Sequence, residues 1–313
     1  MSIDEPILSI VIVTWNSESL ITKCLNTLPR ATSQKFECFV VDSASTDSTV
    51  ARVSQVAPWA NLHQFTENVG FVRANNWALQ NSCSEFVVLL NPDTVPFPGS
   101  FDALIAALER HPEAGIIGPK LLNSDGTLQF STFADPSLTS IVWEYFLRDL
   151  RHPDTPHSGR YSREAYEVER PVDAVVGACL MIKRETLNAI GLLDERYTMY
   201  CEEQDWCVRA RRLGWEVWYT PTAQVIHYGG QSSQLAISRT FLELQRSRFK
   251  LYSKWLPRSK RVTLEFVTRI GLLYQAAFWW KQGMRRHLSS EQWKARLRMT
   301  LAAIPLRPSG LPW

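Results

Sequence analysis

Strands and helices alternate at the start of the chain, and this alternation limits the fold more than any other feature. Leu8–Thr14 is a β-branched run, and residues 18–28 follow as a helix that Asn16 or Ser17 is expected to cap. A second strand, Phe36–Asp42, leads through a turn rich in Ser, Thr and Asp into another helix. Two strand–helix units within about 50 residues are typical of parallel βαβ connections. The sequence therefore predicts an α/β fold with a Rossmann-like, mostly parallel sheet flanked by helices.

The run Phe86–Leu90 has the composition of a strand that is buried on both faces. Pro92 lacks the N–H that a central strand needs, so the strand must end before it and present Asn91 and Asp93 at its carboxyl end. Ligands of open α/β sheets bind at that edge, which makes Asp93 a candidate ligand for a divalent metal. Turn formation explains Asn-Pro-Asp equally well, because all three residue types favour turns.

The remaining segments continue the α/β pattern and then become helical. Expected strands are residues 61–66, 115–121, 127–130, 172–183, 216–220 and 223–227, with a hairpin turn at 123–126. Expected helices are residues 71–81, 100–110, 138–150, 184–190, 199–213, 238–255, 262–283 and 290–304. These ranges divide the chain into a sheet-containing part, residues 1–237, and a helical C-terminal region, residues 238–313.

Charge is spread unevenly along the 313 residues. The net charge is only +3, yet the segment from Phe241 onward holds fifteen Lys and Arg against three Asp and Glu. The six cysteines form no CxxC pair, which favours a reduced, cytoplasmic protein without a zinc site. The N-terminus has no basic region before its first strand, so a signal peptide is not expected. No apolar run reaches the roughly 18 residues of a spanning helix.

Two further strand ends carry candidate binding residues. A carboxylate such as Asp42, at the end of the second strand, can accept hydrogen bonds from a ribose or a nucleobase, and capping the next helix is the alternative. His227 ends a strand before two glycines and is a candidate metal ligand, although a single His is more often structural. The glycine-rich dinucleotide motif and the phosphate loop are absent, which disfavours NAD binding.

Three carboxylates fall within four residues at the start of an expected helix. Glu202 and Asp205 are three residues apart and share a helix face, whereas Glu203 is turned away by about 100°. If this helix start is buried, as its aromatic flanks indicate, at least one carboxyl pKa should rise, which suits a general base. A solvated acidic first turn, favoured by the helix dipole, is the alternative.

Taken in order, seven motifs resemble the family-2 inverting glycosyltransferases, and among them the bacterial rhamnosyltransferase type. The motifs are VTWN, VVDSASTDST, ENVGFVRANNWAL, LLNPDT, VVGACLMIKRE, EEQDW and IHYGGQS. The resemblance covers about residues 7–235. It implies a GT-A fold, a nucleotide-diphosphate sugar donor, a saccharide or lipid-linked acceptor and a divalent cation, Mg²⁺ or Mn²⁺.

The resemblance also assigns roles to individual residues, and it divides the sheet-containing part into a nucleotide-sugar half, about residues 1–95, and an acceptor half, about 96–237. It implies that the nucleotide-sugar site contains Thr14, Asn16, Asp42, Asn68, Gly70, Arg73 and Asn91. Asp93 and His227 correspond to metal ligands, and Glu203 corresponds to the catalytic base, with Asp205 as its rival.

Two positions depart from the family pattern. Asn91 stands where the first Asp of the DxD motif is expected, so the metal loses one anionic ligand that the diphosphate would have to replace. The base motif reads Glu-Glu rather than Glu-Asp, which makes the base one methylene longer. A nucleotidyltransferase and a non-catalytic nucleotide-sugar binder are the alternative functions.

The basic C-terminal region has an apolar stripe of its own. Phe266, Ile270, Leu273, Ala277 and Trp280 recur at helical spacing, and the flanking basic residues are Arg269, Lys281, Arg285 and Arg286. This pattern is typical of a helix that lies on an anionic membrane surface. Packing on the catalytic domain, or on a second subunit in a homo-oligomer, explains it equally well. No nucleic-acid motif accompanies the charge, so nucleic acid is not an expected partner.

Overall fold

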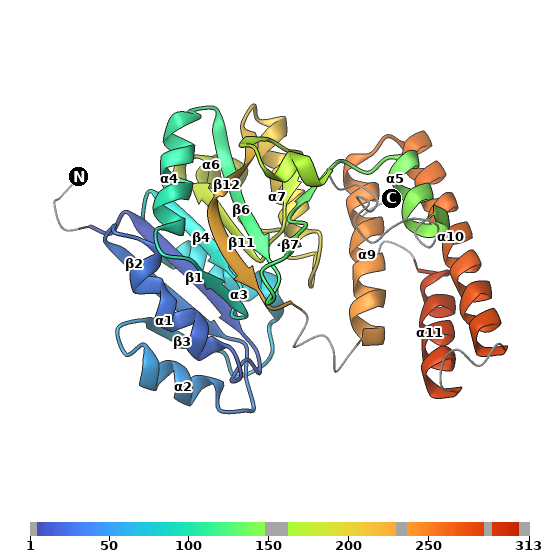
Figure 1. The fold of residues 1–313 in the computed structure, drawn as a ribbon, viewed down its shortest axis with the longest axis horizontal. Coiled ribbons are helices and arrows are strands. Elements are labelled where there is room, and N and C mark those ends of the chain that lie inside the picture. The colour runs from blue at the N-terminus through green and yellow to red at the C-terminus, as the bar shows by residue number, and fades with distance from the viewer. Residues whose placement is uncertain (1–4, 148–161, 230–236, 285–289, 307–313) are drawn as a thin grey trace. The chain divides into compact units, whose positions relative to one another are not determined.

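The chain forms two compact units, which we describe separately. The computed structural model describes residues 5–147, 162–229, 237–284 and 290–306 (Figure 1). The first unit, here the sheet unit, comprises Met1–Phe133, Glu164–Glu195 and Glu202–Ser232. The second, here the helical unit, comprises Ala134–Arg163, Arg196–Cys201 and Ser233–Trp313. The helical unit therefore includes two segments that precede the C-terminal region in sequence.

A single mixed sheet runs through the sheet unit, with the order β3-β2-β1-β4-β11-β6-β12-β5, and β7 and β9 pair at its margins. Strands β1 to β4 are parallel, β11 is antiparallel to both of its neighbours, and β12 is parallel to β6. The strands are β1 Leu8–Thr14, β2 Phe36–Asp42, β3 Asn61–Gln64, β4 Phe86–Leu90, β5 Thr94–Pro96, β6 Ala114–Leu122, β7 Leu128–Gln129, β9 Arg170–Pro171, β11 Cys179–Lys183 and β12 Glu216–His227. The α/β architecture expected from the sequence is confirmed.

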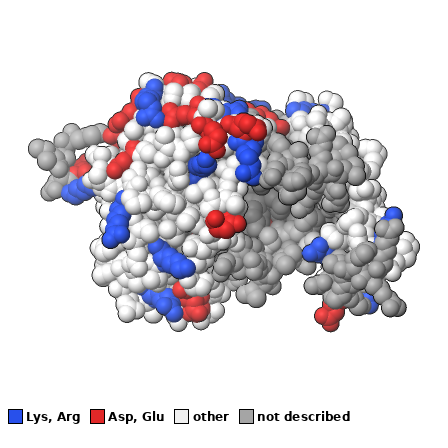
Figure 2. All heavy atoms as spheres, viewed as in Figure 1, with Lys and Arg blue, Asp and Glu red and all other residues white. Residues whose placement is uncertain are grey.

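Helices flank this sheet, as Figure 1 shows. They are α1 Ile21–Ala31, α2 Thr49–Val56, α3 Gly70–Asn81, α4 Ser100–Arg110, α6 Arg184–Ile190 and α7 Glu202–Arg212. A separate two-stranded sheet joins β8, Thr132–Phe133, to β10, Ala174–Val175. Acidic and basic side chains are interspersed over the described surface of the sheet unit in Figure 2.

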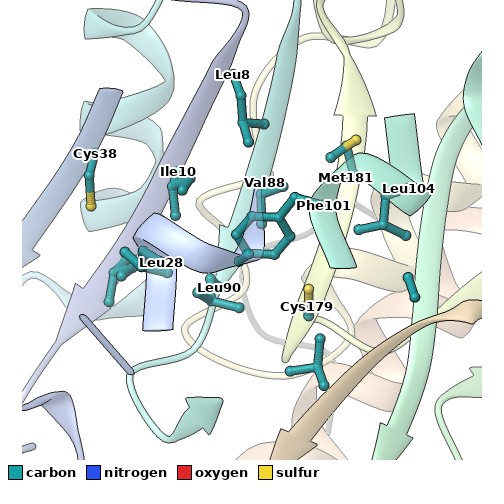
Figure 3. Close-up of a cluster of buried hydrophobic side chains, with 14 of the residues drawn as sticks. Leu8, Ile10, Leu28, Cys38, Val88, Leu90, Phe101, Leu104, Cys179 and Met181 are labelled. Carbon is teal, nitrogen blue, oxygen red and sulfur yellow. The ribbon is translucent and has the colours of Figure 1, made fainter. Parts of the chain in front are cut away.

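The core of the sheet unit includes a row of side chains that crosses four strands. Cys38, Ile10, Val88 and Met181 are paired in register on neighbouring strands, and all are buried. Phe101 of α4 belongs to the same cluster (Figure 3). Burying an aliphatic or aromatic side chain of this size stabilises a fold by about 1.5–3 kcal/mol. The row therefore fixes the register that brings the strand ends to a common edge.

The helical unit is built from α5 Leu138–Val142, a π-helix at Trp143–Leu147, α9 Ile237–Trp255, α10 Arg258–Met284 and α11 Ser290–Ala303. Its buried cluster contains Tyr145, Phe249, Tyr252 and Leu272. The close approach of α10 to the π-helix requires a glycine, because a Cβ at Gly271 would overlap the Tyr145 ring. The three long helices were expected from the sequence; residues 148–150 of the helix expected at 138–150 lie outside the described part.

Several expected strands differ in their limits. Residues 172–183 were expected to be one strand, but they form β10 and β11, which belong to different sheets. Residues 216–227 were expected to be two strands, yet they form the single strand β12. Pro221 lies within this strand, at a register shift between Thr220 and Gln224. The short strand β5 was not expected, and it pairs antiparallel with the end of β12.

Two helices begin later than expected. Helix α1 starts at Ile21, and neither Asn16 nor Ser17 caps it with a side chain. Ser17 instead donates its N–H to Thr49 Oγ1 at 2.7 Å, which ties the first loop to the second. Helix α7 starts at Glu202 rather than residue 199, because Tyr200 and Cys201 have φ angles of 69° and 65° that no α-helix contains.

Candidate active site

The carboxylate of Asp42 is fixed at the carboxyl end of β2. Thr14 Oγ1, at the end of β1, donates to Asp42 Oδ1 at 2.9 Å. The N–H of Ser45 donates to Asp42 Oδ2 at 2.9 Å, and the Ser45 hydroxyl also donates to this carboxylate. Asp42 does not cap α2, because that helix starts at Thr49 and Asp47 accepts the Thr49 N–H. The capping alternative for Asp42 is therefore wrong.

The loops after β1 and β2 are held together through Asn16. Its N–H donates to Ser45 Oγ at 2.8 Å, and its Oδ1 accepts from the N–H of Thr46 at 2.8 Å. Asn16 has a φ of 49°, a left-handed conformation that Asn adopts more readily than most residues. Both loops thus present a preformed polar edge.

A third loop, which precedes α3, joins the same edge. Asn68 Oδ1 accepts from Ser43 Oγ at 3.1 Å and from the N–H of Gly70 at 2.9 Å. Gly70 has a φ of 81°, which a residue with a side chain would adopt only under strain. Arg73 on α3 instead forms an ion pair with Glu195 at 3.1 Å, and both side chains are at least half exposed. The structure therefore brings Thr14, Asn16, Asp42, Asn68 and Gly70 together but gives Arg73 a partner elsewhere.

Asp93 and His227 meet at the same sheet edge, although 134 positions separate them in the sequence. Strand β5 pairs with the end of β12 so that His227 lies opposite Thr94. The N–H of Tyr228 donates to the Asp93 carbonyl at 3.0 Å, which closes the pairing. As a result, His227 Nε2 lies 3.4 Å from Asp93 Oδ1, with both side chains mostly buried.

Gln129 determines which ring nitrogen of His227 carries a proton. Gln129 Nε2 donates to the His227 carbonyl at 3.1 Å and to Asn123 Oδ1 at 2.9 Å, so its amide orientation is set by two acceptors. Gln129 Oε1 must then accept from His227 Nδ1, at 2.7 Å. A neutral His227 therefore keeps a lone pair on Nε2, aimed at the Asp93 carboxylate. Two acceptor atoms that face each other need a proton or a cation between them.

Glu203 lies beside Gly177, and the segment that contains Gly177 adjoins the end of β4. The N–H of Asn91 donates to the Ala178 carbonyl at 2.9 Å, which places residues 177 and 178 beside the end of β4. A Cβ added at Gly177 would lie 3.5 Å from the Cβ of Glu203 and 3.9 Å from its carboxyl carbon. The first turn of α7 thus packs against the segment that adjoins the Asn-Pro-Asp turn.

The three carboxylates of α7 have different environments, as their helical spacing predicted. Glu202 and Asp205 are buried, whereas Glu203 is partly exposed. Asp205 Oδ2 accepts from Arg209 Nε at 3.0 Å, and Arg209 also donates to the Ile190 carbonyl. Burial, and then the neighbouring Glu203 carboxylate, raise the pKa of Glu202 well above its ordinary value. The expected rise in one carboxyl pKa is confirmed, and it falls on Glu202.

The residues present fit a divalent cation that is shared with a ligand. Within the described ranges, no group of three or more His, Cys, Asp and Glu side chains could hold a metal ion. Asp93 and His227 offer one carboxylate oxygen and one imidazole nitrogen, and Gln129 orients the imidazole as outer ligands commonly do. Mg²⁺ is often bound by one or two protein groups together with substrate phosphates.

Sequence reasoning did not identify Gln129 or Gly177 as part of this region. The only signal for Gln129 was its place just after the expected hairpin turn at residues 123–126. Gly177 lay within the motif VVGACLMIKRE and an expected strand, but no role was assigned to it.

Comparison with known proteins gives consistent matches. A family model described as "Glycosyl transferase family 2" matches residues 9–191. The chain is 31% identical over 239 residues to the N-acetylglucosaminyl-diphospho-decaprenol L-rhamnosyltransferase of Mycobacterium tuberculosis, covering 72% of this chain and 78% of that protein. It is 23% identical to rhamnosyltransferase WbbL of Escherichia coli, covering 78% and 92%. The mannosyltransferase PcManGT from Pyrobaculum calidifontis, solved with GDP-Man and Mn²⁺, shares the fold with a TM-score of 0.56 at 17% identity, covering 96% and 86%.

Proposed function

The chain belongs to glycosyl transferase family 2, and on that premise we propose that it transfers rhamnose, with inversion, from a nucleotide-diphosphate sugar to a hydroxyl of a lipid-linked saccharide. The family makes the chain a glycosyltransferase, with relatives in cell-surface polysaccharide synthesis. The sugar and the lipid-linked acceptor are taken from the names of the relatives. The observation that carries the proposal is the pair of acceptor atoms on Asp93 and His227, 3.4 Å apart, beside the polar loops and the first turn of α7.

The polar edge formed by the first three loops is the proposed nucleotide site. The Asp42 carboxylate is already oriented by Thr14 and Ser45, so it can accept from a ribose hydroxyl or a base N–H without reorganisation. Asn91 and Arg73 are proposed to complete the donor side, Arg73 after release from Glu195. Residues 1–95 would then serve the donor, residues 96–237 the acceptor, and residues 238–313 form the helical extension. All six cysteines are free thiols, which supports the proposed cytoplasmic location.

Asp93 and His227 are proposed to hold a divalent cation, Mg²⁺ or Mn²⁺. When bound, such a cation neutralises the charge that develops on the departing diphosphate oxygens. The hydrogen bond from His227 Nδ1 to Gln129 keeps the Nε2 lone pair available for coordination. Asp93 supplies the negative charge that Asn91, as a neutral residue, does not.

Glu203 is proposed to be the general base. It would take the proton of the acceptor hydroxyl as that oxygen attacks the anomeric carbon from the face opposite the diphosphate, so one displacement inverts the centre. Asp205 is bound to Arg209 on the buried side of α7, which favours Glu203 for this role. Burial and the neighbouring Glu203 carboxylate raise the pKa of Glu202, which favours its neutral form beside Glu203.

The test is a transfer reaction with nucleotide-sugar donors, analysed by its products. We expect release of a nucleoside diphosphate that depends on a divalent cation and on an acceptor, and its loss in Asp93→Asn. Release of pyrophosphate in a parallel reaction with a nucleoside triphosphate and a sugar phosphate would indicate a nucleotidyltransferase, and donor binding without turnover would indicate a binder. Thermal shifts with UDP, dTDP and GDP, with and without Mn²⁺, would identify the base; equal shifts without cation would contradict the metal site.

A further inference from the structure

The longest helix of the helical unit, α10, carries an apolar stripe that faces solvent. The large members, Val262, Phe266, Ile270, Leu273, Trp280 and Met284, are between 39% and 61% exposed. They recur at spacings of three, four and seven residues, and Ala277, also exposed, fills the longest interval. At 100° per residue they occupy an arc of about 80° along about 33 Å of helix. They therefore form one continuous surface, here the α10 stripe.

The α10 stripe is not needed for the internal packing of the helical unit. The opposite side of α10 supplies the buried residues Leu264, Thr268, Gly271, Leu272 and Ala276. Helix α10 packs against α5, the π-helix, α9 and α11, and Gly271 on the buried side adjoins the Tyr145 ring. An amphipathic helix has one apolar face for its core; α10 has a second one exposed to water, which marks an interaction surface.

Charge distinguishes the occupants that such a stripe could have. The described residues of α10 and α11 include eight basic side chains and two acidic ones: Arg258, Lys260, Arg261, Arg269, Lys281, Lys294, Arg296 and Arg298 against Glu265 and Glu291. Glu265 is already paired with Arg269 at 3.2 Å. Two copies that met through this region would bring like charges together, whereas an anionic lipid surface would attract it.

The composition of the stripe also fits a lipid interface. Tyr274 and Trp280 are about half exposed on or beside the stripe, and both residue types favour the boundary between hydrocarbon and water. Among the described residues, no helix combines the length and apolar character that crossing a bilayer requires. An interfacial position, parallel to the membrane plane, is the arrangement open to a helix whose exposed side is apolar and has basic flanks.

We propose that the α10 stripe binds the surface of an anionic membrane and lays α10 in the lipid–water interface. Arg285 and Arg286, predicted from the sequence as flanking charges, lie outside the described residues and are not needed for this proposal. The binding depends on the lipid surface alone and not on the identity of the sugar or the acceptor.

The test is vesicle flotation of the full chain without substrates. We expect binding to vesicles of phosphatidylcholine mixed with phosphatidylglycerol, weaker binding at high salt, and little binding to phosphatidylcholine alone. Phe266→Ser combined with Leu273→Ser should lower the partition coefficient at least about tenfold, because both side chains are half exposed and would be buried by lipid. Val168→Ser, which alters an exposed apolar residue of the sheet unit, is the matched control and should bind as the unaltered protein does.

Two results would overturn the proposal. One is absence of binding to the mixed vesicles; the other is a dimer, by light scattering, that the double variant converts to a monomer while vesicle binding stays unchanged. Donor turnover with a water-soluble acceptor should be unaffected in the double variant. Failure of vesicle binding therefore does not contradict the proposed transferase activity, and failure of the transferase assay does not contradict membrane binding.

Discussion

Removal of the Gln129 side-chain amide is the sharpest test of the proposed cation site. Gln129→Met keeps an unbranched side chain of similar length but can no longer accept the hydrogen bond from His227 Nδ1. The imidazole could then rotate or carry its proton on Nε2, and in either case the lone pair facing Asp93 would be lost part of the time. The expected effect is therefore weaker cation binding rather than slower chemistry.

The magnitude follows from the bonds that are lost. A neutral hydrogen bond contributes about 0.5–1.5 kcal/mol, and loss of an outer partner of a ligating His typically lowers metal affinity about 10- to 100-fold. That range corresponds to about 1.4–2.7 kcal/mol of binding free energy. The variant also leaves the His227 carbonyl and Asn123 Oδ1 without this donor, so its free energy of unfolding must be measured in parallel.

The assay is a Mn²⁺ titration of donor turnover. In Gln129→Met the half-saturating Mn²⁺ concentration should rise about 10- to 100-fold, while kcat at saturating Mn²⁺ should stay within about threefold. Gln129→Glu is the control, because a carboxylate can still accept from Nδ1 although, like Met, it removes the donor to the His227 carbonyl and Asn123 Oδ1; it should therefore keep more of the Mn²⁺ affinity than Gln129→Met. An unchanged titration in the Met variant, or equal losses in both variants, would refute the reasoning about the His227 tautomer.

The remaining predictions concern α7 and the helical unit. Glu203→Gln should lower kcat by about 10²–10⁴ without shifting the Mn²⁺ titration. Asp205→Asn should mainly reduce the free energy of unfolding, by about 1–3 kcal/mol, because its bond to Arg209 becomes weaker. Normal turnover in Glu203→Gln together with lost turnover in Asp205→Asn would make Asp205 the base instead. Because the pKa of Glu202 is raised, the folded state keeps a proton that the unfolded chain releases, so stability should fall as pH rises from the ordinary Glu range toward the raised pKa. Glu202→Gln should flatten that fall when urea unfolding is measured at pH values above the ordinary Glu range, and an unchanged slope would contradict it. Gly271→Ala should lower the Tm, since its Cβ would overlap a ring and overpacking costs about 1–3 kcal/mol; an unchanged Tm would show that α10 can move away.

The local sequence was sufficient to predict the strands of the parallel half of the sheet. The apolar runs Leu8–Thr14 and Phe86–Leu90 can be buried on both faces only in a sheet covered by helices, and Pro92 fixes where the second run ends. The polar residues after these strands therefore had to lie at one edge. Hydrophobic periodicity and chain-breaking residues are properties of neighbours in sequence, so they can be recognised without a structure.

The antiparallel half depended on contacts between distant segments. Nothing near residues 172–183 shows that the segment splits between two sheets, because both pieces are apolar and the choice depends on which strands remain unpaired. The continuity of β12 through Pro221 depends likewise on its pairing with β6 on both sides of the register shift. Strand pairing is long-range, and local composition does not encode it.

The sequence by itself determined which side chains are candidates for the proposed site: Asp93, Glu203 and His227 are carboxylate and imidazole groups at the ends of predicted elements. Only the tertiary structure decided how they are supported. Gln129 orients His227 from 98 positions away in the sequence. Gly177, which lacks a side chain, allows Glu203 to pack against the segment beside the end of β4. The physical reason is that the chemistry of a side chain belongs to the residue, whereas its proton, its orientation and its neighbours depend on strand register and packing across the whole fold.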